Sequence, residues 1–244
     1  MIKKYLKNLY EQAMAQAYET AYREICRSLV PDSMVLDCGA GNGWTFKILS
    51  ERCRLTAEQY IGIEWDKTIA KSGRDRGLGI VCHDLNEGIP QESESFSCVY
   101  ALSVLEHLLY PCRFIQESHR VLKRGGRLVL LTPNISTYFT AALILLGKMP
   151  SSGPHPDSDV LIKKEELFKV SSENLKPDSE FDTPRHRHLV VFSYRVLRQY
   201  LRMVGFTNVE GSGFGLYPFP KFAQPFLGKI DPYHCHQMVF WAKK

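Results

Sequence analysis

The chain has 244 residues, of which 31 are Lys or Arg and 26 are Asp or Glu, so its net charge is a mild +5. With 44% hydrophobic and 23% charged residues, its composition excludes a disordered, collagen-like or low-complexity chain. The length is sufficient for one sizeable core and predicts a single domain over residues 1–244. The weak positive charge permits an anionic partner without arguing for one.

Membrane-spanning and disulfide-framework proteins are also disfavoured. The longest apolar stretch, residues 139–146, is far shorter than the ~20 residues that a membrane span needs. The N-terminal segment contains lysines but no apolar core of a secretory signal. The seven cysteines are scattered and include no Cys-x-x-Cys pair, which argues against a disulfide scaffold or a zinc finger. We therefore expect a cytoplasmic protein.

The predicted elements begin with one amphipathic helix over residues 3–29, within an N-terminal segment 1–30 that Pro31 closes. Strands and helices then alternate, which predicts an α/β fold with a mainly parallel, doubly wound sheet and helices on both faces. A segment rich in proline and charge, 147–188, is predicted to be a lid-like insertion. The expected strands are 34–38, 60–65, 79–84, 96–102, 125–133, 206–211 and 236–242. A helix that follows the glycine-rich segment is expected to end near residue 53, and three further helices are expected over 67–76, 112–122 and 193–204.

A glycine-rich turn, GAGNG at 39–43, follows the first strand and precedes a helix. Glycines there let the backbone turn tightly and let a ligand approach closely, at the carboxyl end of a central strand. Trp44 stands where a dinucleotide fingerprint needs glycine, and the phosphate-binding lysine of a P-loop is missing, so a nicotinamide oxidoreductase is disfavoured. The loop suits a nucleoside without a pyrophosphate, although a purely structural turn remains the alternative.

Polar and aromatic residues follow the next two strands. Glu64 can accept hydrogen bonds from both hydroxyls of a ribose, and Trp65 offers a flat face to a base. Asp84 can accept a hydrogen bond from an exocyclic amine, and the Leu85 N–H can donate to a ring nitrogen. The structural alternatives are a solvated acid for Glu64, a core tryptophan for Trp65 and a helix cap for Asp84. Their position at successive strand ends favours a nucleoside site.

The sequence resembles the class I S-adenosylmethionine-dependent methyltransferases over about residues 33–211. The resemblance rests on VLDCGAGNG, GIEWD, HDLNEGIP, FSCVYALSVLEHL, HRVLKRGGRLVLLTPN and RHLVVFSYRVLRQYLRMVGF. It is closest to bacterial methyltransferases of small molecules such as quinone or lipid precursors, sugars and other metabolites. It implies a Rossmann-like sheet of seven strands in the order 3-2-1-4-5-7-6, with strand 7 antiparallel.

The resemblance also implies S-adenosyl-L-methionine as cofactor and assigns residues to it. Position 64 is Glu where many relatives have Asp, which leaves the hydrogen-bonding chemistry intact. The implied contacts are Asp37, Gly39, Ala40 and Gly41 for the methionine part, Glu64 for the ribose, Trp65, Asp84 and Leu85 for the adenine, and Leu102 and Ser103 beside the sulfonium.

Two histidines are candidate catalytic residues, because a hydroxyl acceptor must lose its proton. His107 lies just after the fourth predicted strand, and His188, with His186, lies where the family often returns a lid histidine to the pocket. A structural histidine bonded to the loop backbone is the alternative for His107. No metal is expected at His234, Cys235 and His236, since adjacent strand residues point to opposite faces.

The expected acceptor is a small molecule, methylated at oxygen. Nucleic acid is not expected, because the Asn/Asp-Pro-Pro-Tyr/Phe turn of the amino-methyltransferases is replaced by ALSVLEHL. The apolar side chains within 138–149 and 213–226 have three alternative interpretations. They line an apolar acceptor pocket, they rest on a membrane surface, or they pack in the core, which is the preferred one. A non-catalytic S-adenosylmethionine-binding scaffold or sensor is the alternative function. We interpret the basic residues Arg113, Arg120, Lys123, Arg124 and Arg127 as a solvated face, with an RNA-binding patch as the alternative.

Overall fold

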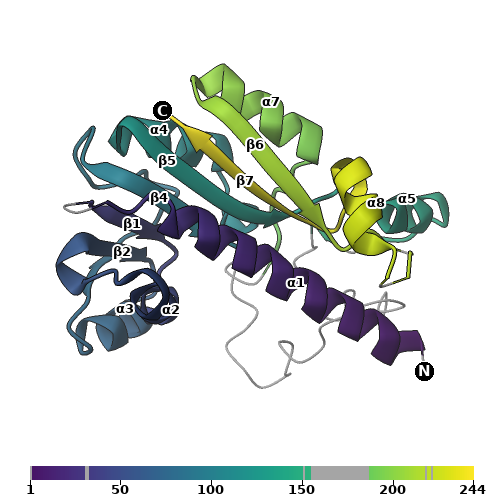
Figure 1. Ribbon diagram of the computed structural model, residues 1–244, viewed down its shortest axis with the longest axis horizontal. Helices are drawn as coiled ribbons and strands as arrows, with labels where there is room; N and C mark the ends of the chain where they lie inside the picture. Colours follow the sequence, from purple (N-terminus) through teal and green to yellow (C-terminus); the bar gives the residue numbers. More distant parts are fainter. Residues whose placement is uncertain (1, 31–32, 151, 155–186, 218, 221) are drawn as a thin grey trace.

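The computed structural model describes residues 2–244 except 31–32, 151, 155–186, 218 and 221. Its strands form one seven-stranded sheet of order β3-β2-β1-β4-β5-β7-β6, in which only β7 runs antiparallel to its neighbours (Figure 1). Both the order and the reversed strand confirm the predicted fold. The strands are β1 Val35–Cys38, β2 Tyr60–Glu64, β3 Gly79–Cys82, β4 Phe96–Leu102, β5 Leu122–Pro133, β6 Thr207–Phe214 and β7 Gln237–Lys243.

The central strands are buried on both faces, as expected for a parallel sheet covered by helices. All four residues of β1 are buried, and the strand lies between β2 and β4. The register places Asp37 opposite Gly62 of β2 and Tyr100 of β4. A carboxylate therefore lies near the carboxyl end of the middle strand, inside an otherwise apolar layer.

Helices pack on both faces of this sheet and form a separate core on each. Residues of α4 and α7 line one core, and residues of α1, α2 and α3 line the other. The predicted helices are confirmed with small shifts at their ends; α1 stops three residues early, at Cys26. The helices are α1 Ile2–Cys26, α2 Trp44–Cys53, α3 Lys67–Arg74, α4 Pro111–Val121, α5 Tyr138–Leu145, α7 Tyr194–Val204 and α8 Gln224–Ile230.

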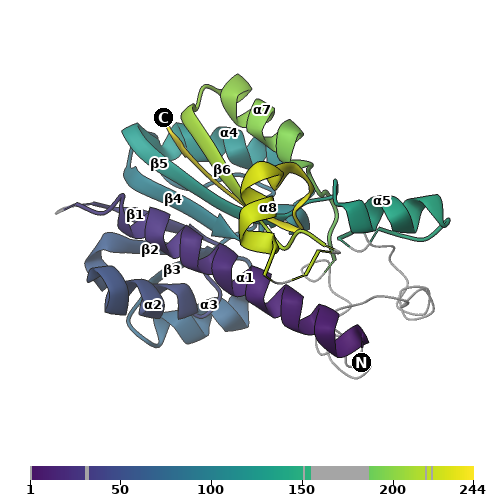
Figure 2. The ribbon, with the colours of Figure 1, turned by 45° about the vertical axis from the view of Figure 1, so that its right-hand side comes forward.

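One end of the sheet gathers several elements. The amino-terminal half of α1, α5 and α8 all lie beyond the carboxyl ends of the parallel strands (Figures 1 and 2). Sequence periodicity predicted neither α5 nor α8 as helices. Most of the predicted insertion, 147–188, lies outside the described residues. Among the described helices, none is both long and apolar enough to cross a bilayer.

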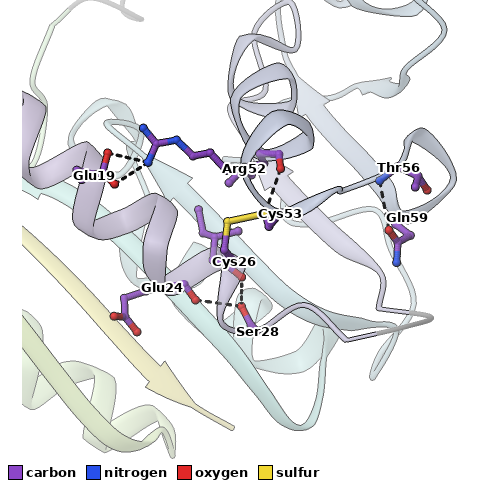
Figure 3. Close-up of a disulfide and its surroundings, with 10 residues drawn as sticks. Glu19, Glu24, Cys26, Ser28, Arg52, Cys53, Thr56 and Gln59 are labelled. Atoms are coloured by element: carbon purple, nitrogen blue, oxygen red, sulfur yellow. Dashed lines mark hydrogen bonds and ion pairs between the residues drawn. A yellow bond between two sulfur atoms is a disulfide. The ribbon is translucent and has the colours of Figure 1, made fainter.

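Contacts from α1 hold this long helix against the rest of the fold. Glu24, which is buried, accepts a hydrogen bond from Arg127 of β5 at 2.5 Å. Cys26 and Cys53 form a disulfide between α1 and α2, with Cα atoms 5.6 Å apart (Figure 3). The scattered cysteines gave no signal for this pair, although one disulfide is not the framework that the sequence argued against.

Candidate functional site

Residues 39–43 form the turn between β1 and α2, and their glycines have different surroundings. The N–H groups of Gly39 and Ala40 both donate to the Ile63 carbonyl of β2 at 2.9 Å. A Cβ added at Gly39 would collide with Val104, whereas one added at Gly41 would have no atom within 4 Å. Both glycines have positive φ, +83° and +55°, which disfavours any side chain. The loop is therefore tied to β2 and leaves open space at Gly41, where a ligand can approach the backbone.

Glu64 ends β2 and faces this loop. Its side chain is buried, one carboxylate oxygen accepts the Gly41 N–H at 3.0 Å, and the other accepts the Asp66 N–H at 3.0 Å. Asp66 in turn caps α3 by accepting from the N–H groups of Thr68 and Ile69. Each Glu64 oxygen retains a lone-pair direction, so the carboxylate is oriented by the backbone and can accept from the two hydroxyls of a ribose.

The residues expected around an adenine lie next to Glu64. Trp65 is 47% exposed, which agrees with a ring face open to a ligand and disagrees with a core tryptophan. Asp84 follows β3, and its Oδ1 accepts from the backbone and side-chain amides of Asn86 at 2.9 and 3.0 Å. Leu85 is buried beneath this turn. Since the His83 N–H donates to the Glu64 carbonyl, the ends of β2 and β3 are held side by side.

Asp37 supplies a second buried carboxylate beneath the glycine turn. The Tyr60 hydroxyl donates to its Oδ2 at 2.9 Å. Burial raises the pKa of the Asp37 carboxyl to about 7, the hydroxyls of Tyr60 and Tyr100 act in the opposite direction, and the charge of Glu64 raises it further. A cationic group of a ligand would favour the ionised form. The two carboxylates and the open glycine turn fit the ammonium and ribose of a nucleoside that carries an amino acid.

The segment after β4 forms the next part of the site. Ser103 has a left-handed backbone, with φ +57°, and its N–H donates to the Leu131 carbonyl of β5 at 2.9 Å. The hydroxyls of Ser103 and Tyr18 share a hydrogen bond of 3.3 Å. Leu102 and Ser103 are half-buried. Sequence reasoning identified the serine but missed Tyr18, because α1 was interpreted through its apolar positions.

His107 and His188, far apart in sequence, lie together. Their rings are edge to face with centroids 5.2 Å apart. Nδ1 of His107 lies 2.9 Å from the Arg187 carbonyl, and Nδ1 of His188 contacts the Ser152 carbonyl. Because a carbonyl only accepts, the Nδ1 atom of each ring carries a proton. Burial lowers the pKa of His107. His186 lies outside the described residues.

Glu106, which sequence reasoning passed over within VLEH, belongs to the same group. It lies with His107 on the short 3₁₀ helix η2, Leu105–His107, and is only 2% exposed. The Thr132 hydroxyl at the end of β5 donates to its Oε2 at 2.9 Å, and its backbone carbonyl accepts the Leu189 N–H at 2.7 Å. Burial raises the pKa of the Glu106 carboxyl to about 7.

The other singled-out clusters have separate surroundings. His234 bonds to Asp231 at 2.8 Å and stacks on Tyr138, whereas the half-buried His236 lies against the rings of Tyr10 and Tyr217. Burial lowers the pKa of His236 to about 4. Four of the five basic residues make contacts within the fold; these are Arg113 with the Asn86 and Glu87 carbonyls, Arg120 with Glu117 and nearby carbonyls, Arg124 with Glu94, and Arg127 with Glu24.

Comparisons with known proteins agree with this geometry. Residues 36–130 match the family model described as "Methyltransferase domain". A probable S-adenosylmethionine-dependent methyltransferase of Mycobacterium tuberculosis is 30% identical over 105 residues, which are 43% of this chain and 37% of that protein. An uncharacterised protein of Methanocaldococcus jannaschii is 29% identical over 44% of this chain and 48% of its own length. The chain thus matches less than half the length of each of these two relatives.

Solved structures extend the likeness in fold to nearly the whole chain. A methyltransferase of Thermotoga maritima, described as a possible histamine N-methyltransferase, has a TM-score of 0.55 at 16% identity and covers 99% of this chain and 97% of its own. A phosphoethanolamine N-methyltransferase of Haemonchus contortus has a TM-score of 0.59 at 14% identity, over 93% of this chain and 53% of that one. The segment that matches the methyltransferase-domain model contains the glycine turn and Glu64, and the solved methyltransferase structures share the fold of nearly the whole chain.

Proposed function

We propose that the protein transfers the methyl group of S-adenosylmethionine to an oxygen atom of a small-molecule acceptor. One observation carries the choice of oxygen: buried Glu106 and half-buried His107 and His188 form a polar group beyond the end of β4. Leu102 and Ser103, which we place beside the sulfonium, precede this group by only a few residues. A hydroxyl acceptor needs a base that removes its proton. We infer that this polar group provides it.

The cofactor supplies an electrophilic methyl group on a sulfonium. In our proposal the Asp37 carboxylate pairs with the ammonium of the methionine part, and the backbone of Gly39, Ala40 and Gly41 lies against that part. Glu64 accepts from the ribose hydroxyls. The adenine lies between the Trp65 face and the turn formed by Asp84 and Leu85. The support for these roles is the orientation of Glu64 by two backbone N–H groups and the open space at Gly41.

Methyl transfer from a sulfonium is a direct displacement, so holding the acceptor oxygen in line with the methyl supplies much of the rate. The remaining requirement is an acceptor oxygen that carries a lone pair free for attack. His107 and His188 both donate from Nδ1 to backbone carbonyls, which orients the two rings, and in neutral His107 this leaves the lone pair on Nε2. We propose these two histidines as the catalytic residues that activate the acceptor oxygen, while Ser103 and Tyr18 shape the wall beside it.

We also propose that the acceptor has an apolar portion. Apolar side chains are exposed on α5 and around α8, at the same end of the sheet as the site (Figure 2). The Tyr138 hydroxyl bonds to Asp231 at 2.6 Å, which ties α5 to the segment between α8 and β7. These exposed residues are Ile144, Leu145, Leu146, Phe222, Phe226 and Ile230.

Transfer of a labelled methyl group tests this function against a non-catalytic scaffold or sensor. The protein would be incubated with S-adenosylmethionine labelled at the methyl carbon and a panel of phenols, sugars and lipid precursors, and products would be identified by mass. We expect a labelled methyl ether from a hydroxylated, partly apolar acceptor, and strongly reduced transfer by His107→Ala. Calorimetric binding of S-adenosylhomocysteine together with no transfer to the panel or to a cell extract would contradict the proposal.

A further inference from the structure

Glu106, His107 and His188 meet the geometric requirement for binding a metal ion. Each offers one ligand atom, and these three atoms all lie within 4.8 Å of one another. The two first residues come from η2, directly after β4, and His188 comes from the segment that precedes α7. In the part of the chain that the structure describes, this is the one group of three or more such residues.

The hydrogen bonds around the two imidazoles match those of metal ligands. A metal-binding histidine almost always donates its second ring N–H to a carbonyl or carboxylate, which fixes the tautomer and directs the other nitrogen to the metal. His107 and His188 both donate through Nδ1 to backbone carbonyls, of Arg187 and Ser152 respectively. In neutral His107 this tautomer leaves the lone pair on Nε2, the nitrogen that a metal ion would use.

The Glu106 carboxyl group has the complementary feature, because it is buried and has no cationic partner among the described residues. Glu106 is 2% exposed, and its side chain accepts from the neutral Thr132 hydroxyl. No Lys or Arg among the described residues forms an ion pair with it. A buried carboxylate is costly unless a cation compensates it. A bound divalent ion would supply that compensation, and the Thr132 hydrogen bond would orient the ligand.

We propose that Glu106, His107 and His188 bind a divalent first-row transition metal ion, with Zn²⁺, Mn²⁺ or Co²⁺ as suitable occupants. Two imidazoles and one carboxylate suit these borderline ions better than Ca²⁺ or Mg²⁺. Bonds of about 2.0–2.2 Å place ligand atoms roughly 3–3.5 Å apart. Side-chain adjustments of about 1 Å would close the present group around an ion and leave coordination positions open. This differs from the His234–Cys235–His236 segment, whose histidines have separate surroundings.

The role of the ion rests on the proposed function. An acceptor hydroxyl bound at an open position would lose its proton to solvent near neutral pH, because the cation stabilises the alkoxide. The oxygen then forms a bond to the methyl carbon as the carbon–sulfur bond breaks, and sulfur takes the bonding pair to give neutral S-adenosylhomocysteine. In this arrangement the two histidines hold the ion, and the ion in place of a protein base lowers the pKa of the acceptor.

Titration with Co²⁺ tests the site directly, since its visible absorption reports coordination. The full chain would be treated with a chelator, freed of it, and titrated with Co²⁺ and Zn²⁺ by absorption and calorimetry. We expect one equivalent to bind with micromolar or tighter affinity. His107→Ala, His188→Ala and Glu106→Gln should each weaken binding at least tenfold. Thr132→Val, which keeps the side-chain volume, should weaken it about 10–100-fold through the orientation of Glu106.

His119→Ala provides the matched control, because His119 lies on α4 and packs edge to face on Phe206; it should bind the ion like the wild type. Calorimetry with S-adenosylhomocysteine on every variant shows that the cofactor site is intact. Cofactor binding without saturable Co²⁺ binding at 1:1, or equal Co²⁺ binding by the ligand variants and the wild type, would overturn the metal site and leave the proposed function standing. Specific Co²⁺ binding without methyl transfer to any hydroxylated acceptor would support the site and contradict the proposed function.

Discussion

Replacing Glu64 is the most direct test of the cofactor site. Its two oxygens accept the Gly41 and Asp66 N–H groups at 3.0 Å each, which leaves one lone-pair direction per oxygen for the ribose. Glu64→Ala removes the ligand's charged hydrogen-bond partner and leaves both backbone N–H groups without their acceptor. A hydrogen bond to a charged group contributes about 1.5–3 kcal/mol. We therefore expect cofactor affinity to fall by about 10–150-fold.

Two ligands make this experiment specific to the ribose. Calorimetric titration with S-adenosylhomocysteine and with methylthioadenosine, which keeps the ribose but lacks the amino acid part, should show similar losses for Glu64→Ala. Glu58→Ala is the matched control, because Glu58 is exposed beside the start of β2 and should leave both affinities unchanged. An affinity of a folded Glu64→Ala protein within twofold of the wild type would refute the placement of the ribose.

Three further predictions concern Asp37, Gly41 and Glu24. Because the pKa of Asp37 is about 7, lowering the pH to 6 protonates the carboxylate that we pair with the ligand's ammonium. S-adenosylhomocysteine should therefore bind about tenfold more weakly at pH 6 than at pH 8. Methylthioadenosine, which has no ammonium, should show no such dependence by calorimetry. Gly41→Ala should cost about 1 kcal/mol in denaturant unfolding because φ is positive, yet it should weaken cofactor binding strongly because its Cβ would occupy the open space; unchanged affinity would argue against that approach. Glu24→Gln should lower the free energy of unfolding by about 1.5–3 kcal/mol, because Glu24 is buried against Arg127. Glu19→Gln, in the exposed pair with Arg52, should lower it by less than about 1 kcal/mol. Equal losses in the two variants would contradict this distinction.

Local sequence patterns predicted the strands, which the structure confirms, and they are the basis of the cofactor contacts that we propose. The first strand, the glycines and Glu64 act through short segments, in which apolar runs, turn residues and the end of a strand are all visible in sequence. The family resemblance then supplied the strand order and the reversed β7. Positions such as Trp65 and Asp84 could be proposed because parallel strands present their carboxyl ends at one edge of the sheet.

The remaining features depend on contacts between distant segments. Glu106 is recognisable as a site residue only once Thr132 lies beside it, and Tyr18 only once α1 crosses the end of β4. The Cys26–Cys53 disulfide similarly requires α1 to lie against α2 (Figure 3). Periodicity assigns a helix its buried face, but it does not determine which distant strand end that face meets. These residues therefore required the structure.

The turn at Ser103 connects the cofactor side of the site with the acceptor side. A residue other than glycine in the left-handed region costs roughly 1 kcal/mol, and such conformations persist only where the surroundings compensate. Here the Ser103 N–H is fixed by the Leu131 carbonyl and its hydroxyl by Tyr18. The chain then enters η2, which places Glu106 against Thr132 and His107 against His188. Because β5 anchors both the turn and Glu106, Leu102 and Ser103, proposed beside the sulfonium, and His107, proposed at the acceptor oxygen, are held on one short segment, an arrangement that favours in-line transfer.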